Sequence, residues 1–378
     1  MMFVLLNQII TIQLRKIMIR NILLIIFVFI SFNACIDKNK EDSIKIGVIL
    51  GLTGKYSDLG LYEKNGIVLA FDKINYQINN KKVELIFKDD KQDKEVNEKA
   101  VKELIESDVK YIIGNATSSM TEVTLDITSK YNDIFQISPS ASSSKFSNID
   151  DNFFRLQTAN SSKHFINLIK LLQKNNAKKI FLIGDKKNKS YLYDYMHIFN
   201  DNKNMKFEEI IDASLPYEEI LEKIKPADFI VQVQNSRDSA SLIQYLRINN
   251  NHTPIISSGW AMNKEFIENS GKWSEGIYFI SSDYINYEDE EYRKFEKYFS
   301  KVYRYEANRS NMQGYQTAKV LIEALQHGNE NVNDIKKYII EKETFYISGD
   351  ELSFNKFGDI KTPYYIFEVI DSKFKKIK

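Results

Sequence analysis

Short apolar runs alternate with amphipathic stretches of helix length along most of the chain, and this alternation restricts the fold more than any other feature. Runs at 44–50, 81–87 and 109–113 each lead through a small polar loop into a helical pattern, and the rhythm restarts after Thr158. Strands that alternate with helices at this spacing form right-handed βαβ units. The sequence therefore predicts an α/β fold of doubly wound parallel sheets.

The chain has 378 residues, more than one hydrophobic core usually organises, so we expect two lobes with a hinge near Thr158. Amphipathic helices predicted at 290–305, 313–325 and 332–340 are expected to return to the first lobe, because another strand-like segment, 363–370, comes later. The predicted lobes are 44–158 plus 283–350 and 159–282 plus 351–378.

The amino terminus has the pattern of a secretory signal. Arg20 precedes an apolar run at 22–30, and small residues follow it. The run is too short for a membrane span, which needs about 20 residues. We predict a signal peptide over 1–34, with translation expected to start at Met18.

Cys35 is the only cysteine of the chain and directly follows Ala34 at the end of the apolar run. This arrangement resembles a bacterial lipobox, in which the cysteine is lipidated. We predict a lipid anchor at Cys35 and a charged tether over 35–43 that holds the domain off a membrane in the cell envelope. A secreted protein without lipid and a retained anchor are the alternatives.

Charge argues against nucleic acid as a partner. Lys and Arg number 52 and Asp and Glu 51, which leaves a formal charge of +1. A nearly neutral chain has no general electrostatic affinity for a polyanion.

A polar loop after the strand-like run at 109–113 has the features of an anion site. Ser119 and Glu122 have the spacing of a capping box, which predicts Ser119 as the N-cap and leaves Thr117 and Ser118 just outside the helix. The first amides of a helix lack intrahelical partners and carry partial positive charge, so they suit a carboxylate.

A second hydroxyl loop, containing Ser140 and Ser142, follows the next strand-like run at 134–137. Neighbouring parallel strands present their loops at the same carboxyl edge, where open α/β sheets bind ligands. The two loops together predict a site for a small anion, although capping of surface helices alone is the alternative.

The sequence contains few motifs that are typical of enzymes. The four histidines are scattered, and no nucleophile elbow, phosphate-binding loop or dinucleotide loop follows a strand. Ser142 and Lys145 form a Ser-x-x-Lys pair without its usual companion motifs. We expect binding without catalysis, with no metal and no cofactor; a serine enzyme is a distant alternative.

Several motifs in order resemble one family: 44–49, 52–54, 88–90, 111–114 with 118–119, 137–142, and 354–355 with 358–359. The chain resembles the type I solute-binding proteins of ABC importers, most closely the branched-chain amino-acid and amide receptors. The resemblance implies two doubly wound lobes joined by a multi-strand hinge, a cleft that closes on a small-molecule ligand, and ABC permease subunits as partners. It also implies a monomer outside the cytoplasm.

In that family the positions matching Ser118, Ser140 and Ser142 hold the ligand's α-carboxylate. Members that bind amino acids tend to have an acidic residue near the position of Gly259, whereas here no carboxylate follows until Glu265. The expected ligand-binding residues are Tyr56, Thr117, Ser118, Ser119, Ser140, Ser142, Lys189, Tyr191, Asn235, Ser236 and Trp260.

The missing acid argues against a plain aliphatic amino acid, because a buried ammonium without a partner is costly. A dicarboxylate, an aromatic acid and a short peptide remain open: Lys189 favours a second anionic group and Trp260 an aromatic one. Because the second lobe lacks this expected acid, a different function is the alternative: an envelope sensor or scaffold lipoprotein that signals to a protein partner.

Overall fold

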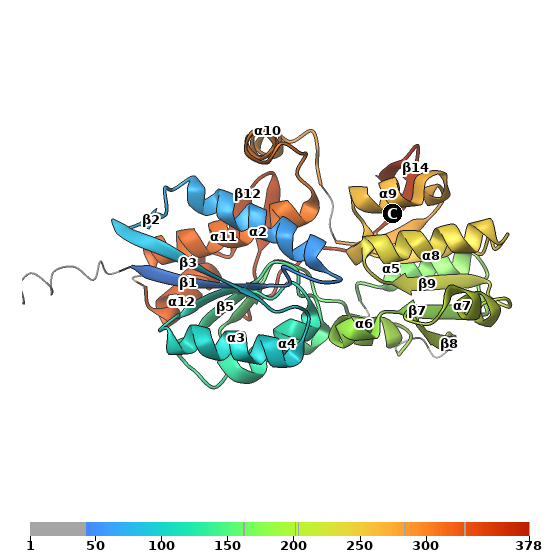
Figure 1. Ribbon diagram of the computed structural model, residues 1–378, viewed down its shortest axis with the longest axis horizontal. Helices are drawn as coiled ribbons and strands as arrows, with labels where there is room; N and C mark the ends of the chain where they lie inside the picture. The colour runs from blue at the N-terminus through green and yellow to red at the C-terminus, as the bar shows by residue number, and fades with distance from the viewer. Residues whose placement is uncertain are drawn as a thin grey trace, which may run out of the picture. The chain divides into compact units, whose positions relative to one another are not determined.

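The structure is a computed structural model that describes residues 43–161, 163–200, 202, 204–282, 285–328 and 330–377. The predicted signal peptide, Cys35 and nearly all of the tether lie outside these residues. The described chain forms two α/β lobes (Figure 1). The predicted fold class is thereby confirmed.

The first lobe is built on a six-stranded sheet of order β2-β3-β1-β4-β5-β6. Helices α2 and α11 lie on one face of this sheet and α3 and α4 on the other (Figure 1). Its strands are β1 (Ile44–Leu50), β2 (Gln77–Ile78), β3 (Lys81–Asp89), β4 (Tyr111–Gly114), β5 (Phe135–Ser138) and β6 (Phe153–Arg155). Its helices are α2 (Ser57–Asp72), α3 (Lys94–Glu106), α4 (Ser118–Thr128), α10 (Glu290–Tyr303), α11 (Arg309–His327) and α12 (Val332–Lys342), and a β12 (Thr344–Ile347) and β13 (Asp350–Ser353) hairpin follows.

The second lobe is built on a seven-stranded sheet of order β15-β14-β11-β10-β9-β7-β8. One buried apolar cluster packs under α5 and α6, and a second packs under α7, α8 and α9. The strands are β7 (Ile180–Gly184), β8 (Phe207–Asp212), β9 (Phe229–Val233), β10 (Ile255–Ser258), β11 (Tyr278–Ser281), β14 (Tyr365–Ile370) and β15 (Lys373–Lys376). The helices are α5 (Ile166–Lys174), α6 (Lys189–Met196), α7 (Tyr217–Lys223), α8 (Ser236–Ile248) and α9 (Lys264–Ser270).

Both sheets are mixed rather than wholly parallel. In the first sheet β2 runs antiparallel to β3, and in the second β14 runs antiparallel to β11 and β15 antiparallel to β14. The sequence analysis assigned no strand to β2, β6, β12, β13 or β15. These strands have two to four residues each, too few for an apolar period to stand out, and their pairing partners stabilise them.

Two features of the fold position the site. β4 and β5 pair in parallel, with Tyr111 opposite Phe135 and Ile113 opposite Ile137, so both hydroxyl loops leave the sheet at one edge, as expected. Helices α2 and α11 approach each other closely at two glycines. A Cβ on Gly66 would lie 1.9 Å from the carbonyl oxygen of Asn311, and one on Gly314 would lie 2.1 Å from that of Glu63.

Candidate ligand-binding site

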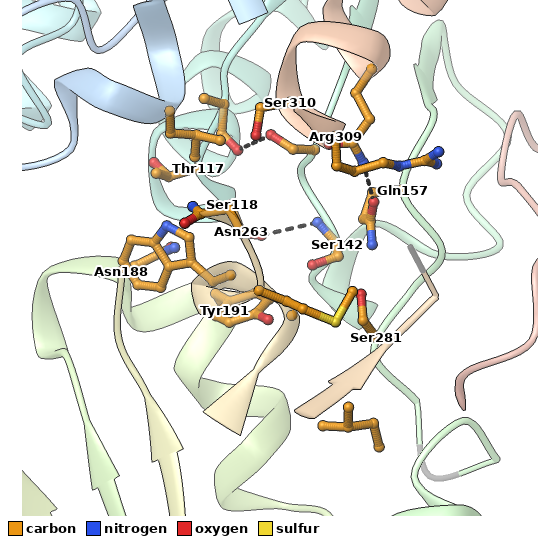
Figure 2. Close-up of a pocket in the computed structure, with 18 of the residues that line it drawn as sticks. Thr117, Ser118, Ser142, Gln157, Asn188, Tyr191, Asn263, Ser281, Arg309 and Ser310 are labelled. Carbon is orange, nitrogen blue, oxygen red and sulfur yellow. Dashed lines mark hydrogen bonds between the residues drawn. The ribbon is translucent and has the colours of Figure 1, made fainter. Parts of the chain in front are cut away.

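A cavity of ≈ 70 Å³ lies between the two lobes. Figure 2 shows Thr117 and Ser118 on one side of it, Asn188 and Tyr191 below them, and Ser142 and Gln157 across from them. Its wall combines hydroxyl and carboxamide groups with aromatic and apolar side chains. The principal lining residues are Thr117, Ser118, Ser140, Ser142, Gln157, Asn188, Tyr191, Gly259, Trp260, Met262, Ile280, Ser281, Arg309 and Gln313.

The start of α4 differs from its predicted form. The N-cap is Thr117, and the helix begins at Ser118, one residue before the predicted cap. Ser119 and Glu122 form no capping box; instead the Ser119 hydroxyl accepts from the Ser190 amide at 3.1 Å, and the Glu122 carboxylate accepts from the Ser190 hydroxyl. The prediction was wrong because these side chains find partners on the other lobe, which local spacing does not reveal.

The two hydroxyl loops are bonded to each other. The Ser118 hydroxyl accepts from the amides of Ser142 at 3.1 Å and Ser143 at 3.2 Å. The Ser142 hydroxyl in turn accepts from the Asn160 carboxamide at 3.3 Å. Thr117, Ser118, Ser140 and Ser142 therefore form one polar wall of the cavity, as the β4–β5 pairing led us to expect.

Asn188 is a cavity residue that the sequence analysis missed. It is 4% exposed, and its Oδ1 accepts from the Ser119 amide at 3.1 Å, in the first turn of α4. Its carboxamide oxygen thus accepts from one of the helix-end amides that we expected to bind a carboxylate. Asn188 immediately precedes Lys189, whose side chain is exposed and does not line the cavity.

The other expected residues divide between wall and support. Tyr191 and Trp260 line the cavity, with ring centroids 5.9 Å apart. Tyr56 stands behind Trp260 at 5.1 Å and donates to Asp185 at 2.5 Å. Asn235 and Ser236 lie outside the lining, because Asn235 caps α8 through the Asp238 amide at 2.9 Å and Ser236 donates to Glu265 at 2.8 Å.

A buried acid behind the hydroxyl loops was also missed. Glu63, on α2, is 0% exposed; one carboxyl oxygen contacts the Ser140 hydroxyl, and the other has no hydrogen-bond partner. Burial raises the pKa of the Glu63 carboxyl to about 8, and the nearby acid Asp90 adds to the shift. The available signal was an acid at the spacing of a buried helix face, with Ile67 and Ala70 four and seven residues on.

Within the described residues no cluster of three His, Cys, Asp or Glu side chains is arranged to hold a metal. Lys145, which forms the Ser-x-x-Lys pair with Ser142, donates to the Glu122 carboxylate at 2.8 Å, and its ammonium lies 5.3 Å from the Tyr193 ring centroid. Among the described residues, no helix is long and apolar enough to cross a bilayer.

Residues 43–193 match the family model described as "Periplasmic binding protein". Over these residues, fewer than half of the 378, the sequence is similar to that family, and the described chain has the fold of solved solute-binding proteins of ABC transporters. No curated protein sequence matches this chain.

Solved structures of this periplasmic binding protein fold resemble the chain over most of its length. The leucine-binding protein LivK of Thermotoga maritima is 18% identical, with a TM-score of 0.78 over 89% of this chain and 98% of the other. LivJ of Streptococcus pneumoniae, in complex with isoleucine, is 23% identical, with a TM-score of 0.76 over 88% and 98%. A solute-binding protein of R. palustris, in complex with benzoate, is 17% identical, with a TM-score of 0.78 over 89% and 95%. At these identities the likeness establishes the fold.

Proposed function

We propose that this protein is an extracytoplasmic receptor that closes its two lobes on a small carboxylate-bearing solute and delivers it to an ABC permease. The observation that carries the proposal is the meeting of the α4 N-terminus with the Ser140 and Ser142 loop at an interlobe cavity. A helix start and convergent hydroxyls form an anion site. The complexes of similar proteins with isoleucine and with benzoate, both carboxylates, support this class.

The composition of the wall favours an acid without an ammonium group. No Asp or Glu is among the described residues that line the cavity. Arg309 is the charged side chain in the wall, and its guanidinium pairs with Asp350. An ammonium would therefore be desolvated there without a carboxylate partner. Tyr191, Trp260 and Met262 offer an apolar and aromatic surface to the rest of the solute.

The remaining parts of the proposal concern the chain around the site. We propose a signal peptide over 1–34 and lipidation of Cys35, which would keep the receptor close to its permease. We further propose a monomer that opens and closes about the hinge between a lobe of 44–158 plus 283–350 and a lobe of 159–282 plus 351–378, except that β13 (Asp350–Ser353) stays with the first lobe because it pairs with β12. The ligand-binding residues that we propose are those in the wall, with Tyr56 supporting Trp260.

A thermal-shift titration with benzoate, isoleucine and 4-methylpentanoate tests the receptor function. A solute that binds only the folded protein stabilises it by about 2.7 kcal/mol at one hundred times its Kd. The double variant S118L/S142L should lose the shift. A matched double variant at exposed serines outside the cavity, S214L/S372L, should keep it. An unchanged shift in S118L/S142L removes these serines from the site.

A sensor or scaffold protein is the second candidate. It is favoured by the bonds that the lobes make to each other, since the Ser119 amide is taken by Asn188 and the Ser190 hydroxyl by Glu122. A chain that holds itself closed in this way needs no solute to reach the closed form. Absence of any thermal shift across a broad metabolite panel, together with the capture of an envelope protein by the wild type, supports this function over the first.

A further inference from the structure

Asn188 stands at the start of α6 but does not cap that helix. It occupies the N-cap position, where asparagine is among the preferred residues, yet its side chain forms no capping bond with α6. Its Oδ1 accepts instead from the Ser119 amide at 3.1 Å, in the first turn of α4 on the other lobe. The Ser190 amide of α6 in turn donates to the Ser119 hydroxyl at 3.1 Å. The two helices therefore exchange caps across the cleft.

The bond to Ser119 fixes which way the Asn188 carboxamide faces. A backbone N–H only donates, so the carboxamide oxygen must meet it, and the NH2 group lies on the other branch. Among the described residues this Nδ2 has no hydrogen-bond partner, although Asn188 is only 4% exposed. Asn188 lines the cavity below Ser118 (Figure 2). The N–H protons of Nδ2 therefore remain for a group bound in the cavity.

The two serine hydroxyls of the wall are donors as well. The Ser118 oxygen accepts from the amides of Ser142 and Ser143, so both of its lone pairs are used. The Ser142 oxygen accepts from Asn160. Neither hydroxyl donates its own proton to another described residue, and both line the cavity. Asn188 adds a donor from the second lobe beside them, because its oxygen is bonded to the residue next to Ser118.

We propose that Asn188 is a specificity-determining residue that donates from Nδ2 to the carboxylate of the solute, so that the second lobe completes the anion site of the first. The inference rests on the proposed function, because it takes the Ser118 and Ser142 loops as the carboxylate site. The carboxamide accepts from α4 on its oxygen and donates from its nitrogen, and each bond of such a chain polarises the next. An acid is thereby held from both lobes only when they are closed.

This arrangement selects an acid over the corresponding carboxamide. A carboxylate has acceptor lone pairs on both oxygens, which suits three donors in Ser118, Ser142 and Asn188. A carboxamide in the same place has an NH2 group instead of one of these oxygens, and that group would face a donor. No Asp or Glu among the described residues of the wall could accept from it. A donor left unpaired in a closed site costs affinity.

Calorimetry at pH 8 with benzoate and benzamide, which have the same shape, tests the selection. The wild type should prefer benzoate, and N188A should bind benzoate roughly tenfold more weakly, the usual effect of one hydrogen bond to a charged group. N188D can still accept from the Ser119 amide but turns a negative oxygen to the cavity, so its preference should reverse to benzamide. A merely structural role would not reverse it.

The matched control is N331D, the same change at a residue outside the cavity wall. Asn331 is the exposed N-cap of α12, and its side chain accepts from the amides of Asn333 and Asp334. Aspartate caps a helix as well as asparagine does, so N331D should keep both affinities of the wild type. Circular dichroism of the solute-free variants verifies that N188A and N188D are folded.

Nuclear magnetic resonance of the wild type tests the bond directly. The side-chain NH2 signals of Asn188 are those missing from the ¹H–¹⁵N spectrum of N188A, and benzoate should move at least one of them downfield. No movement at saturating benzoate, or equal benzoate affinity in the wild type and N188A, overturns the proposal and leaves the receptor function standing. Failure of benzoate to bind also overturns it. Binding of isoleucine or 4-methylpentanoate would then keep the receptor function, and binding of no acid rejects both.

Discussion

Replacing Asp359 by asparagine is expected to destabilise the protein by about 3 kcal/mol, within the range for breaking a buried ion pair by removing one charge. Arg155, at the end of β6, is 0% exposed, and Asp359 is 7% exposed. The guanidinium donates through Nε to Asp359 at 2.8 Å and through Nη1 to the Ser143 carbonyl at 2.6 Å. The variant keeps the shape of the side chain but leaves a desolvated cation without its partner.

Urea unfolding followed by circular dichroism measures this cost as a change in the free energy of unfolding. The matched control is Asp371→Asn, because Asp371 also pairs with a cation at 2.7 Å but is exposed. We expect no measurable change there, since exposed pairs contribute little. The double variant R155M/D359L should be more stable than D359N, because an apolar pair removes the uncompensated charge.

The Asp359→Asn substitution should also affect the ligand-binding site. Arg155 holds the carbonyl of Ser143, whose amide, with that of Ser142, donates to Ser118. D359N should therefore weaken solute binding as well as stability. A loss below about 1 kcal/mol, close to the exposed control, would refute the view that this pair is a buried, mutually dependent unit.

Three further predictions concern other buried groups. The pKa of Glu63 is raised from 4.5 to about 8 in the folded protein, so folding takes up a proton between these two pH values. The free energy of unfolding should therefore fall as pH rises through this window, by up to about 1.4 kcal/mol per pH unit. In thermal unfolding, E63Q should show a flatter dependence of stability on pH. Gly314→Ala should cost about 1–3 kcal/mol in urea unfolding because the new Cβ would lie 2.1 Å from the Glu63 carbonyl oxygen, whereas Leu61→Ala, at an exposed position of α2, should cost little. Burial and the facing Glu265 of the other lobe raise the pKa of Asp58 to about 6, so closure of the lobes takes up a proton. Solute affinity measured by calorimetry should therefore rise severalfold from pH 7.5 to 5.5 in the wild type. The Asp58→Asn variant should not show this rise.

Much of the scaffold could be predicted from local pattern. Strand runs such as 44–50 and helical runs such as 332–340 recur in the structure with shifts of a few residues at most. The parallel pairing of β4 with β5 agrees with the expectation that these consecutive strands are neighbours in one sheet, and it brings Ser118 and Ser142 together. Short strands such as β6 escaped because their stability comes from neighbours in the sheet.

The sequence by itself determined the α/β alternation, the two-lobe size and the hydroxyl loops at one sheet edge, because period and strand order depend on residues close together in the chain. Only the tertiary structure decided what those hydroxyls bond to. Ser119 has the spacing to cap its own helix, yet it meets Ser190, 71 residues away, across the cleft. In the sequence Glu63 is one polar residue on a helix face, whereas in the structure its side chain is fully buried beside Ser140 and its backbone packs against Gly314 of α11. Spacing specifies neighbours within a turn or two, whereas burial and partners across a cleft depend on how whole elements pack.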